Sequence, residues 1–231
     1  MDFGANGRSA RSHLPKNEDR TSFVLGNRPS HQAPLQRTIP QRRQTDCEPR
    51  LQTESLTQMI LTGSQIHQGV ENGDIVIRPF HKRQITPNAY DFRLGDRCCI
   101  YTEETLDAAV ENKTRTFTIP PEGIILEPTR IYLVNTKETM GSHRFVPIIR
   151  GRSSVGRLGI FIDVTADLID LGSINQWTLQ LHAVLPVRVY PGMLIGQVTF
   201  WRTYGKRSQY QGKYLDRPSP ASSLSYLDYE K

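Results

Sequence analysis

RGRSSVGRLG at residues 150–159 places three arginines, two adjacent serines and three glycines within ten positions. Arginine guanidinium groups and serine hydroxyls bind phosphate oxygens, and glycine lets the backbone approach such a ligand closely. A basic surface turn would have a similar composition. Since β-rich runs flank this segment at 146–149 and 159–164, the sequence predicts a phosphate-binding segment set into a β fold.

The rest of the ordered region continues this pattern of short β-rich runs with Pro, Gly, Asn and Asp between them. The runs are 75–77, 90–94, 99–101, 116–119, 123–126, 131–134, 146–149, 159–164, 177–183, 187–190 and 194–200. In 178–182, Leu179 and Leu181 alternate with polar residues, which is typical of a strand with one buried face. Residues 190–192 (YPG) form a turn signal between the last two runs. The sequence therefore predicts an all-β sandwich or barrel.

The two ends of the chain differ from this β region. Residues 1–55 hold nine basic and six acidic residues and few apolar runs, so we expect a disordered basic tail. Residues 56–72 have apolar positions that predict one or two short helical turns. Residues 204–231 are rich in Tyr, Ser, Gly and Pro and are interpreted as a C-terminal lid or tail. The predicted β domain is thus 56–203.

Composition limits the possible partners and compartments. A net charge of +6 and a pI near 9.3 favour polyanionic partners such as nucleotides. Nucleic acid is an unlikely partner, since no helix-turn-helix, RNP or zinc-finger pattern accompanies the charge. The sequence shows neither a membrane span nor a signal peptide. Three cysteines without disulfide or metal spacing are typical of a reducing compartment, so we expect a cytoplasmic protein.

Six short motifs lie along residues 61–217. They are IVIRP at 75–79, QITPNAYDFRLG at 84–95, GRSSVGRLG at 151–159, TADLID at 165–170, PGMLIGQ at 191–197 and GKY at 212–214. Together, and in this order, they resemble the dCTP deaminase branch of the dUTPase-like superfamily. The resemblance implies a distorted β-barrel or jelly roll that assembles as a homotrimer, with each active site where subunits meet.

The resemblance also implies roles for individual residues in binding a dCTP- or dUTP-like nucleotide. The triphosphate and neighbouring-site contacts would be Arg152, Ser153, Ser154 and Arg157. Asp170 would bind the deoxyribose 3′-hydroxyl, while main-chain groups of Val164 and Thr165 would meet the pyrimidine edge. Lys213 would close the lid over phosphate, with Arg217 following it where the family usually has glutamine. Mg²⁺ would arrive on the nucleotide phosphates, so no metal ligands are expected in the protein, and no zinc.

The chain departs from the family at the residue that activates water. Deaminases of this family use a glutamate ten residues after the aspartate that corresponds to Asp170, and this chain has Gln180 there. An amide forms hydrogen bonds but cannot take up a proton. His182, Asp163 and Asp167 lie nearby in the sequence and could serve as alternative bases, although ordinary surface roles are the simpler reading of all three.

Three functions therefore remain open. The first is the family reaction, in which dCTP and water give dUTP and ammonia. The second is dUTP diphosphatase activity, which gives dUMP and pyrophosphate and needs no glutamate at this position. The third is a catalytically silent trimer that binds nucleotide or acts as a scaffold. The resemblance implies a dCTP deaminase-like hydrolase, but Gln180 stands where the general-base glutamate is expected, so whether the chain is an enzyme stays open.

Overall fold

The computed structural model describes residues 59–215, 217 and 219–229. Its helical elements are α1 (Gly63–Glu71), α2 (Ser153–Gly156) and the 3-10 helices η1 (Lys82–Gln84) and η2 (Ser225–Asp228). Its strands are β1 (Ile75–Arg78), β2 (Tyr90–Tyr101), β3 (Thr114–Thr118), β4 (Ile124–Leu126), β5 (Tyr132–Thr136), β6 (Thr139–Ser142), β7 (Phe145–Gly151), β8 (Ile160–Phe161), β9 (Thr178–Ala183), β10 (Val187–Val189) and β11 (Leu194–Arg202).

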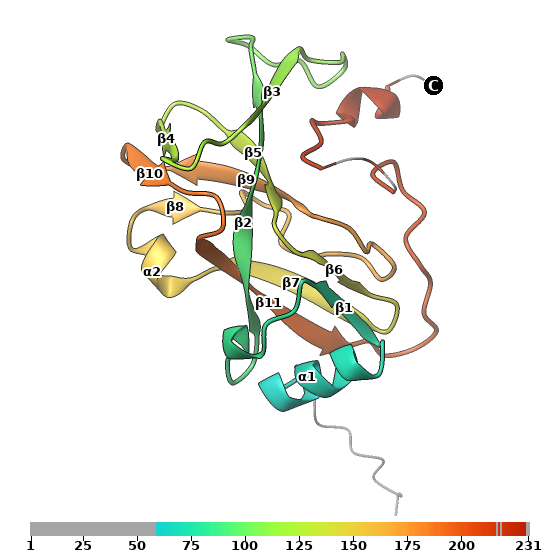
Figure 1. Ribbon diagram of the computed structural model, residues 1–231. Helices are drawn as coiled ribbons and strands as arrows, with labels where there is room; N and C mark the ends of the chain where they lie inside the picture. The colour runs from blue at the N-terminus through green and yellow to red at the C-terminus, as the bar shows by residue number, and fades with distance from the viewer. Residues whose placement is uncertain (1–58, 216, 218, 230–231) are drawn as a thin grey trace, which may run out of the picture. The chain divides into compact units, whose positions relative to one another are not determined.

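Most strands join one antiparallel sheet in the order β7-β11-β2-β5-β9-β8, with β3 also paired to β2. The long strand β2 connects its two halves (Figure 1): its first residues pair with β11, and its last residues pair with β3 and β5. Two smaller antiparallel pairs, β1–β6 and β4–β10, complete the described β structure. The prediction of a mainly β fold with a short N-terminal helix is confirmed.

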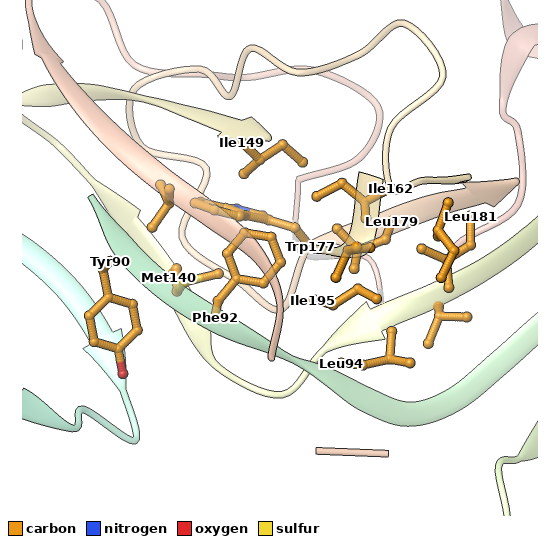
Figure 2. Close-up of a cluster of buried hydrophobic side chains, with 14 of the residues drawn as sticks. Tyr90, Phe92, Leu94, Met140, Ile149, Ile162, Trp177, Leu179, Leu181 and Ile195 are labelled. Carbon is orange, nitrogen blue, oxygen red and sulfur yellow. The ribbon is translucent and has the colours of Figure 1, made fainter. Parts of the chain in front are cut away.

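The hydrophobic core fills the inside of this curved sheet. Phe92 and Leu94 of β2, Leu179 and Leu181 of β9, and Ile195 of β11 are fully buried and meet in one cluster (Figure 2). Along β9, buried and partly exposed residues alternate as the sequence predicted. Burying each of these side chains contributes roughly 1.5–3 kcal/mol, so β9 has a well-defined inner and outer face.

The runs 90–94 and 99–101 were predicted as two strands, but they form one strand, β2. Gly95, Asp96 and Arg97 suggest a turn in the sequence, whereas the structure accommodates them in a bulge between Leu94 and Cys98. The Arg97 main-chain N–H donates to Asn135 Oδ1 at 2.9 Å, and the Asp96 carbonyl accepts from the Ile119 N–H at 2.6 Å. These long-range partners keep the strand continuous.

Other local predictions were also wrong. Residues 159–164 contain only the two-residue strand β8, and β6 and the short helix α2 were not predicted. The turn at 190–192 links β10 to β11, but these strands lie in different sheets, because β10 pairs with β4 and β11 pairs with β2 and β7. The sequence gives no strand signal for β6, because this strand has only four residues and one of them is Gly141, at φ +154°.

The predicted tail at 1–55 lies outside the described residues. In the part of the chain that the structure describes, no helix has the length and apolar character needed to cross a membrane.

The buried face of β9 should dominate stability. Leu179 is 0% exposed, so Leu179→Ala should lower the free energy of unfolding by about 2–5 kcal/mol, because it leaves a cavity in the core. The matched change Leu106→Ala, at a side chain that is 47% exposed, should cost less than about 0.5 kcal/mol. Urea unfolding at one fixed protein concentration measures both. Equal losses in the two variants would contradict this assignment of the core.

Candidate functional site

The arginine- and serine-rich segment begins where β7 ends and contains the short helix α2. Arg152, the residue before this helix, forms an ion pair with Asp91 of β2, with Nε and Oδ2 3.0 Å apart. The other oxygen of Asp91 accepts a hydrogen bond from Gln197 Nε2 of β11 at 2.8 Å. Because Asp91 is only 6% exposed, this carboxylate needs such partners. The Asp91 carboxylate therefore holds the Arg152 guanidinium against strand β2.

The remaining polar residues of the segment face solvent. Ser153, Ser154 and Arg157 are exposed, and the Arg157 guanidinium donates to the Ser153 carbonyl at 3.2 Å. Two hydroxyls and a guanidinium on one turn of chain are suited to contact phosphate oxygens. That this segment binds phosphate stays a prediction.

A cavity of about 550 Å³ lies between β9, the 165–169 loop and the C-terminal segment. Its walls mix apolar side chains with uncharged polar ones, and Arg217 is the charged residue among the described lining residues. The lining residues are Tyr101, Ile131, Leu133, Ile149, Thr165, Ala166, Leu168, Ile169, Ser173, Asn175, Gln176, Trp177, Thr178, Gln180, Tyr214, Arg217, Ser219, Ala221, Ser222 and Ser223. A small organic ligand with several hydrogen-bonding groups fits this volume and chemistry.

Gln180 lies on the outer face of β9, between the buried residues Leu179 and Leu181, and lines this cavity. Its main-chain N–H donates to the Ile162 carbonyl at 2.9 Å. Its side-chain Oε1 accepts from the main-chain N–H of Val164 at 3.4 Å. The strand and this hydrogen bond together fix where the carboxamide lies.

The structure brings only some of the predicted site residues together. Thr165, Gln180 and Arg217 line the cavity, whereas Val164 and Asp170 border it in sequence without lining it. The segment of Arg152, Ser153, Ser154 and Arg157 also lies outside the lining. Lys213 forms an ion pair with Asp228, with Nζ and Oδ2 2.5 Å apart, and this hydrogen bond raises the pKa of Lys213.

The three candidate bases do not line the cavity either. His182 Nδ1 lies 3.5 Å from the Arg130 carbonyl, and its ring packs beside Phe161. Asp167 pairs with Arg150 at 3.5 Å. Burial raises the pKa of Asp163, with a further increase from the Asp167 carboxylate. Among the described lining residues, therefore, none has a carboxylate or imidazole that could take up a proton.

The C-terminal segment was predicted as a lid that carries Lys213 and Arg217, but its contacts with the cavity wall were not predicted. The Ser223 N–H donates to the Tyr101 hydroxyl at 2.9 Å, and the Ala221 N–H donates to Thr178 Oγ1 at 3.0 Å. The Leu224 N–H donates to the Tyr214 hydroxyl at 3.0 Å. The Tyr- and Ser-rich composition was a signal for such contacts, but it does not identify the partners.

The ion pair of Asp91 was also missed, along with a second buried pair beside it. Glu138 is 0% exposed and accepts from Arg93 Nε at 2.7 Å and from the Arg93 main-chain N–H at 2.9 Å. Both Asp91 and Arg93 belong to the QITPNAYDFRLG motif. The available signal in the sequence was that two charged residues, Asp91 and Arg93, stand within a run of apolar residues, because buried charges need charged partners.

The described residues therefore form a mainly β domain with a polar cavity and an exposed arginine- and serine-rich turn. The model of one family, described as dCTP deaminase-like, matches residues 60–203. The chain therefore belongs to the dCTP deaminase-like family.

Individual relatives agree with this assignment. The chain is 43% identical over 172 residues to a protein named "dCTP deaminase, dUMP-forming" of Clostridium acetobutylicum, covering 74% of this chain and 99% of that protein. It is 41% identical over 174 residues to a protein of the same name from Leptospira biflexa, covering 75% and 99%. A 2′-deoxycytidine 5′-triphosphate deaminase structure from Agrobacterium tumefaciens matches with a TM-score of 0.52 at 20% identity, covering 63% of this chain and 48% of that one. This structure supports the dUTPase-like fold.

The raised pKa of Asp163 gives a pH-dependent prediction. An acid whose pKa is raised by folding favours the folded state at low pH and loses that contribution as the pH rises through its folded-state pKa. Asp163→Asn should therefore raise the free energy of unfolding at pH 7, and this gain should disappear below the ordinary pKa of 3.8. Urea unfolding at several pH values measures it.

Asp96→Asn is the control, because it removes the same charge at an exposed position of β2. A stability gain from Asp163→Asn that stays constant down to pH 3, or that the control reproduces, would contradict the burial of this carboxyl.

Proposed function

We propose that the chain binds a pyrimidine deoxynucleoside triphosphate with its base in the cavity beside Gln180. The observation that carries this proposal is the lining of the cavity, which combines Gln180 and Thr165 with neutral hydrogen-bonding groups at a volume of about 550 Å³. Such groups recognise the edge of a base and a sugar hydroxyl. Asp170 lies five residues beyond Thr165, and its carboxylate would accept a hydrogen bond from the 3′-hydroxyl of the sugar.

The triphosphate would be bound by the exposed turn at α2. Arg157, Ser153 and Ser154 provide donors for phosphate oxygens, and Arg152 adds positive charge from its fixed place beside Asp91. Lys213 would join them when a phosphate takes over from Asp228. Mg²⁺ would enter with the nucleotide and neutralise part of the phosphate charge.

A complete site of this kind needs a second copy of the chain, and we propose the homotrimer of the family. In one copy, the α2 turn does not line the cavity, so the phosphate-binding groups would come from a neighbouring subunit. Near α2 and β8, the side chains of Leu158, Phe161, Val184 and Leu185 are more than half exposed. The Val184 N–H donates to the Gly159 carbonyl at 2.9 Å, which brings two parts of this apolar surface together. Subunit contact would bury it.

The proposed reaction is the hydrolytic deamination of dCTP. Water adds through its oxygen to C4 of cytosine and gives up two protons: one ends on N3, and the other goes to the 4-amino group. The C4–N bond then breaks, ammonia leaves, and the 4-oxo uracil ring remains. Gln180 can orient the water through hydrogen bonds, but it cannot carry these protons. We therefore propose that deamination by this chain is slow.

A second candidate reaction is the cleavage of dUTP to dUMP and pyrophosphate. It is favoured by the names of the relatives at 41–43% identity, which are described as dUMP-forming. This reaction breaks a phosphoanhydride bond and needs no proton acceptor at C4, so Gln180 would not prevent it. Chromatography of the products from dCTP and from dUTP separates the two reactions. Nucleotide binding without any product would indicate a silent binding protein.

Restoring a carboxylate at position 180 tests the role of this residue. Gln180→Glu should raise the rate of dCTP deamination by about 10²- to 10⁴-fold, the range associated with a general acid–base group. Ammonia release, measured with the full chain, Mg²⁺ and dCTP, gives the rate.

Gln176→Glu is the matched control, because Gln176 also lines the cavity but donates to the Lys137 carbonyl on another part of its wall. It should give no such gain. If Gln180→Glu binds dCTP but deaminates no faster than the unchanged chain, Gln180 does not lie at the reacting carbon.

The α2 turn can be tested by charge removal. Arg157→Ala should weaken the binding of a deoxynucleoside triphosphate by about 10- to 100-fold, the loss expected for a hydrogen bond to a charged group. Arg188→Ala is the control, because Arg188 is also exposed and likewise donates to a main-chain carbonyl, that of Glu122 at 3.3 Å. Titration calorimetry measures both. Equal affinities of the two variants would remove Arg157 from the phosphate site.

A further inference from the structure

The orientation of the Gln180 carboxamide is determined by its surroundings. The group has an accepting oxygen at one end and a donating NH₂ at the other. The main-chain N–H of Val164 lies 3.4 Å from Oε1, and an N–H can be paired only with the oxygen. The NH₂ end is therefore the one left to interact with a ligand in the cavity.

The described lining of the cavity has hydroxyl and amide oxygens but no carboxylate. A 4-amino pyrimidine needs an acceptor opposite its amino group, and a carboxylate would be the strongest acceptor. None of the described lining residues is an aspartate or glutamate. At Gln180, Val164 engages one of the two lone pairs of the oxygen, whereas the NH₂ has no hydrogen-bond partner among the described residues. The NH₂ is therefore the end that needs a partner from the ligand.

We infer that Gln180 makes this cavity selective for uracil deoxynucleotides over cytosine deoxynucleotides. The O4 carbonyl of uracil accepts a hydrogen bond from the Gln180 NH₂, whereas the 4-amino group of cytosine would place two donors face to face. This inference rests on the proposed placement of the base beside Gln180. It assigns to Gln180 the role of a specificity-determining residue.

This selectivity has a kinetic consequence for the proposed deamination. The product carries the 4-oxo group and would bind more tightly than the substrate. A chain with Gln180 is then suited to retaining a uracil nucleotide, either as a product or as the substrate for phosphoanhydride cleavage. A glutamate at this position would reverse the preference, because an ionised carboxylate only accepts hydrogen bonds.

Binding of the α,β-imido analogues of dUTP and dCTP to the full chain with Mg²⁺ tests this inference by titration calorimetry at pH 7.5. The imido bridge prevents cleavage, and chromatography after each titration verifies that the base is unchanged. We expect the dUTP analogue to bind about 10- to 100-fold more tightly, the range for matched against mismatched hydrogen-bonding groups. Gln180→Glu should reduce or invert this ratio, and Gln65→Glu on the exposed face of α1 should leave it unchanged.

Each outcome separates the specificity from the proposed function. Equal binding of the two analogues, or tighter binding of the dCTP analogue to the unchanged chain, would overturn the specificity and leave nucleotide binding in place. Binding of neither analogue would overturn the proposed function itself. If Gln180→Glu is unfolded, the ratio for the unchanged chain still decides the question.

Discussion

The ion pair between Asp91 and Arg152 joins the two parts of the chain on which the site depends. Asp91 belongs to β2, the strand that connects both halves of the sheet, and Arg152 immediately precedes the exposed α2 turn. Gln197 of β11 occupies the second carboxylate oxygen. Since a nearly buried carboxylate without partners would be costly, the turn is held at a defined place on the sheet. The exposed residues Ser153, Ser154 and Arg157 follow Arg152 directly along the chain, so the ion pair sets where this turn begins on the sheet.

The same sheet sets the position of the cavity through β9. Leu179 and Leu181 bury one face of this strand, so the residue between them must point to the other face. Hydrophobic burial of its neighbours therefore sets the face of β9 from which the Gln180 side chain projects. Its hydrogen bond to Val164 then selects which end of the amide meets a ligand. Residues 179–181 thus contribute both to the hydrophobic core, through the two leucines, and to the cavity lining, through Gln180.

Sequence patterns predicted the strand character of β9 and the mainly β fold, because these depend on local alternation and on short motifs. The family resemblance singled out Gln180, and the structure adds that this residue lines the cavity. They did not predict β2 as one strand, because its continuity depends on Asn135, far away in the chain. Nor did they predict the cavity, whose wall requires Tyr101 and Thr178 to meet the C-terminal segment. Contacts between segments that are distant in the chain produce no hydrophobic periodicity in either segment, so sequence patterns do not predict them.

A crystal structure of the full chain with Mg²⁺ and the α,β-imido analogue of dUTP would test most directly whether this cavity is a nucleotide site. We predict the uracil ring in the cavity, its O4 within hydrogen-bonding distance of the Gln180 amide nitrogen, and its phosphates in contact with Arg157 of a neighbouring copy. A nucleotide bound elsewhere, with Gln180 in contact only with the protein, would contradict both the site and the role assigned to Gln180.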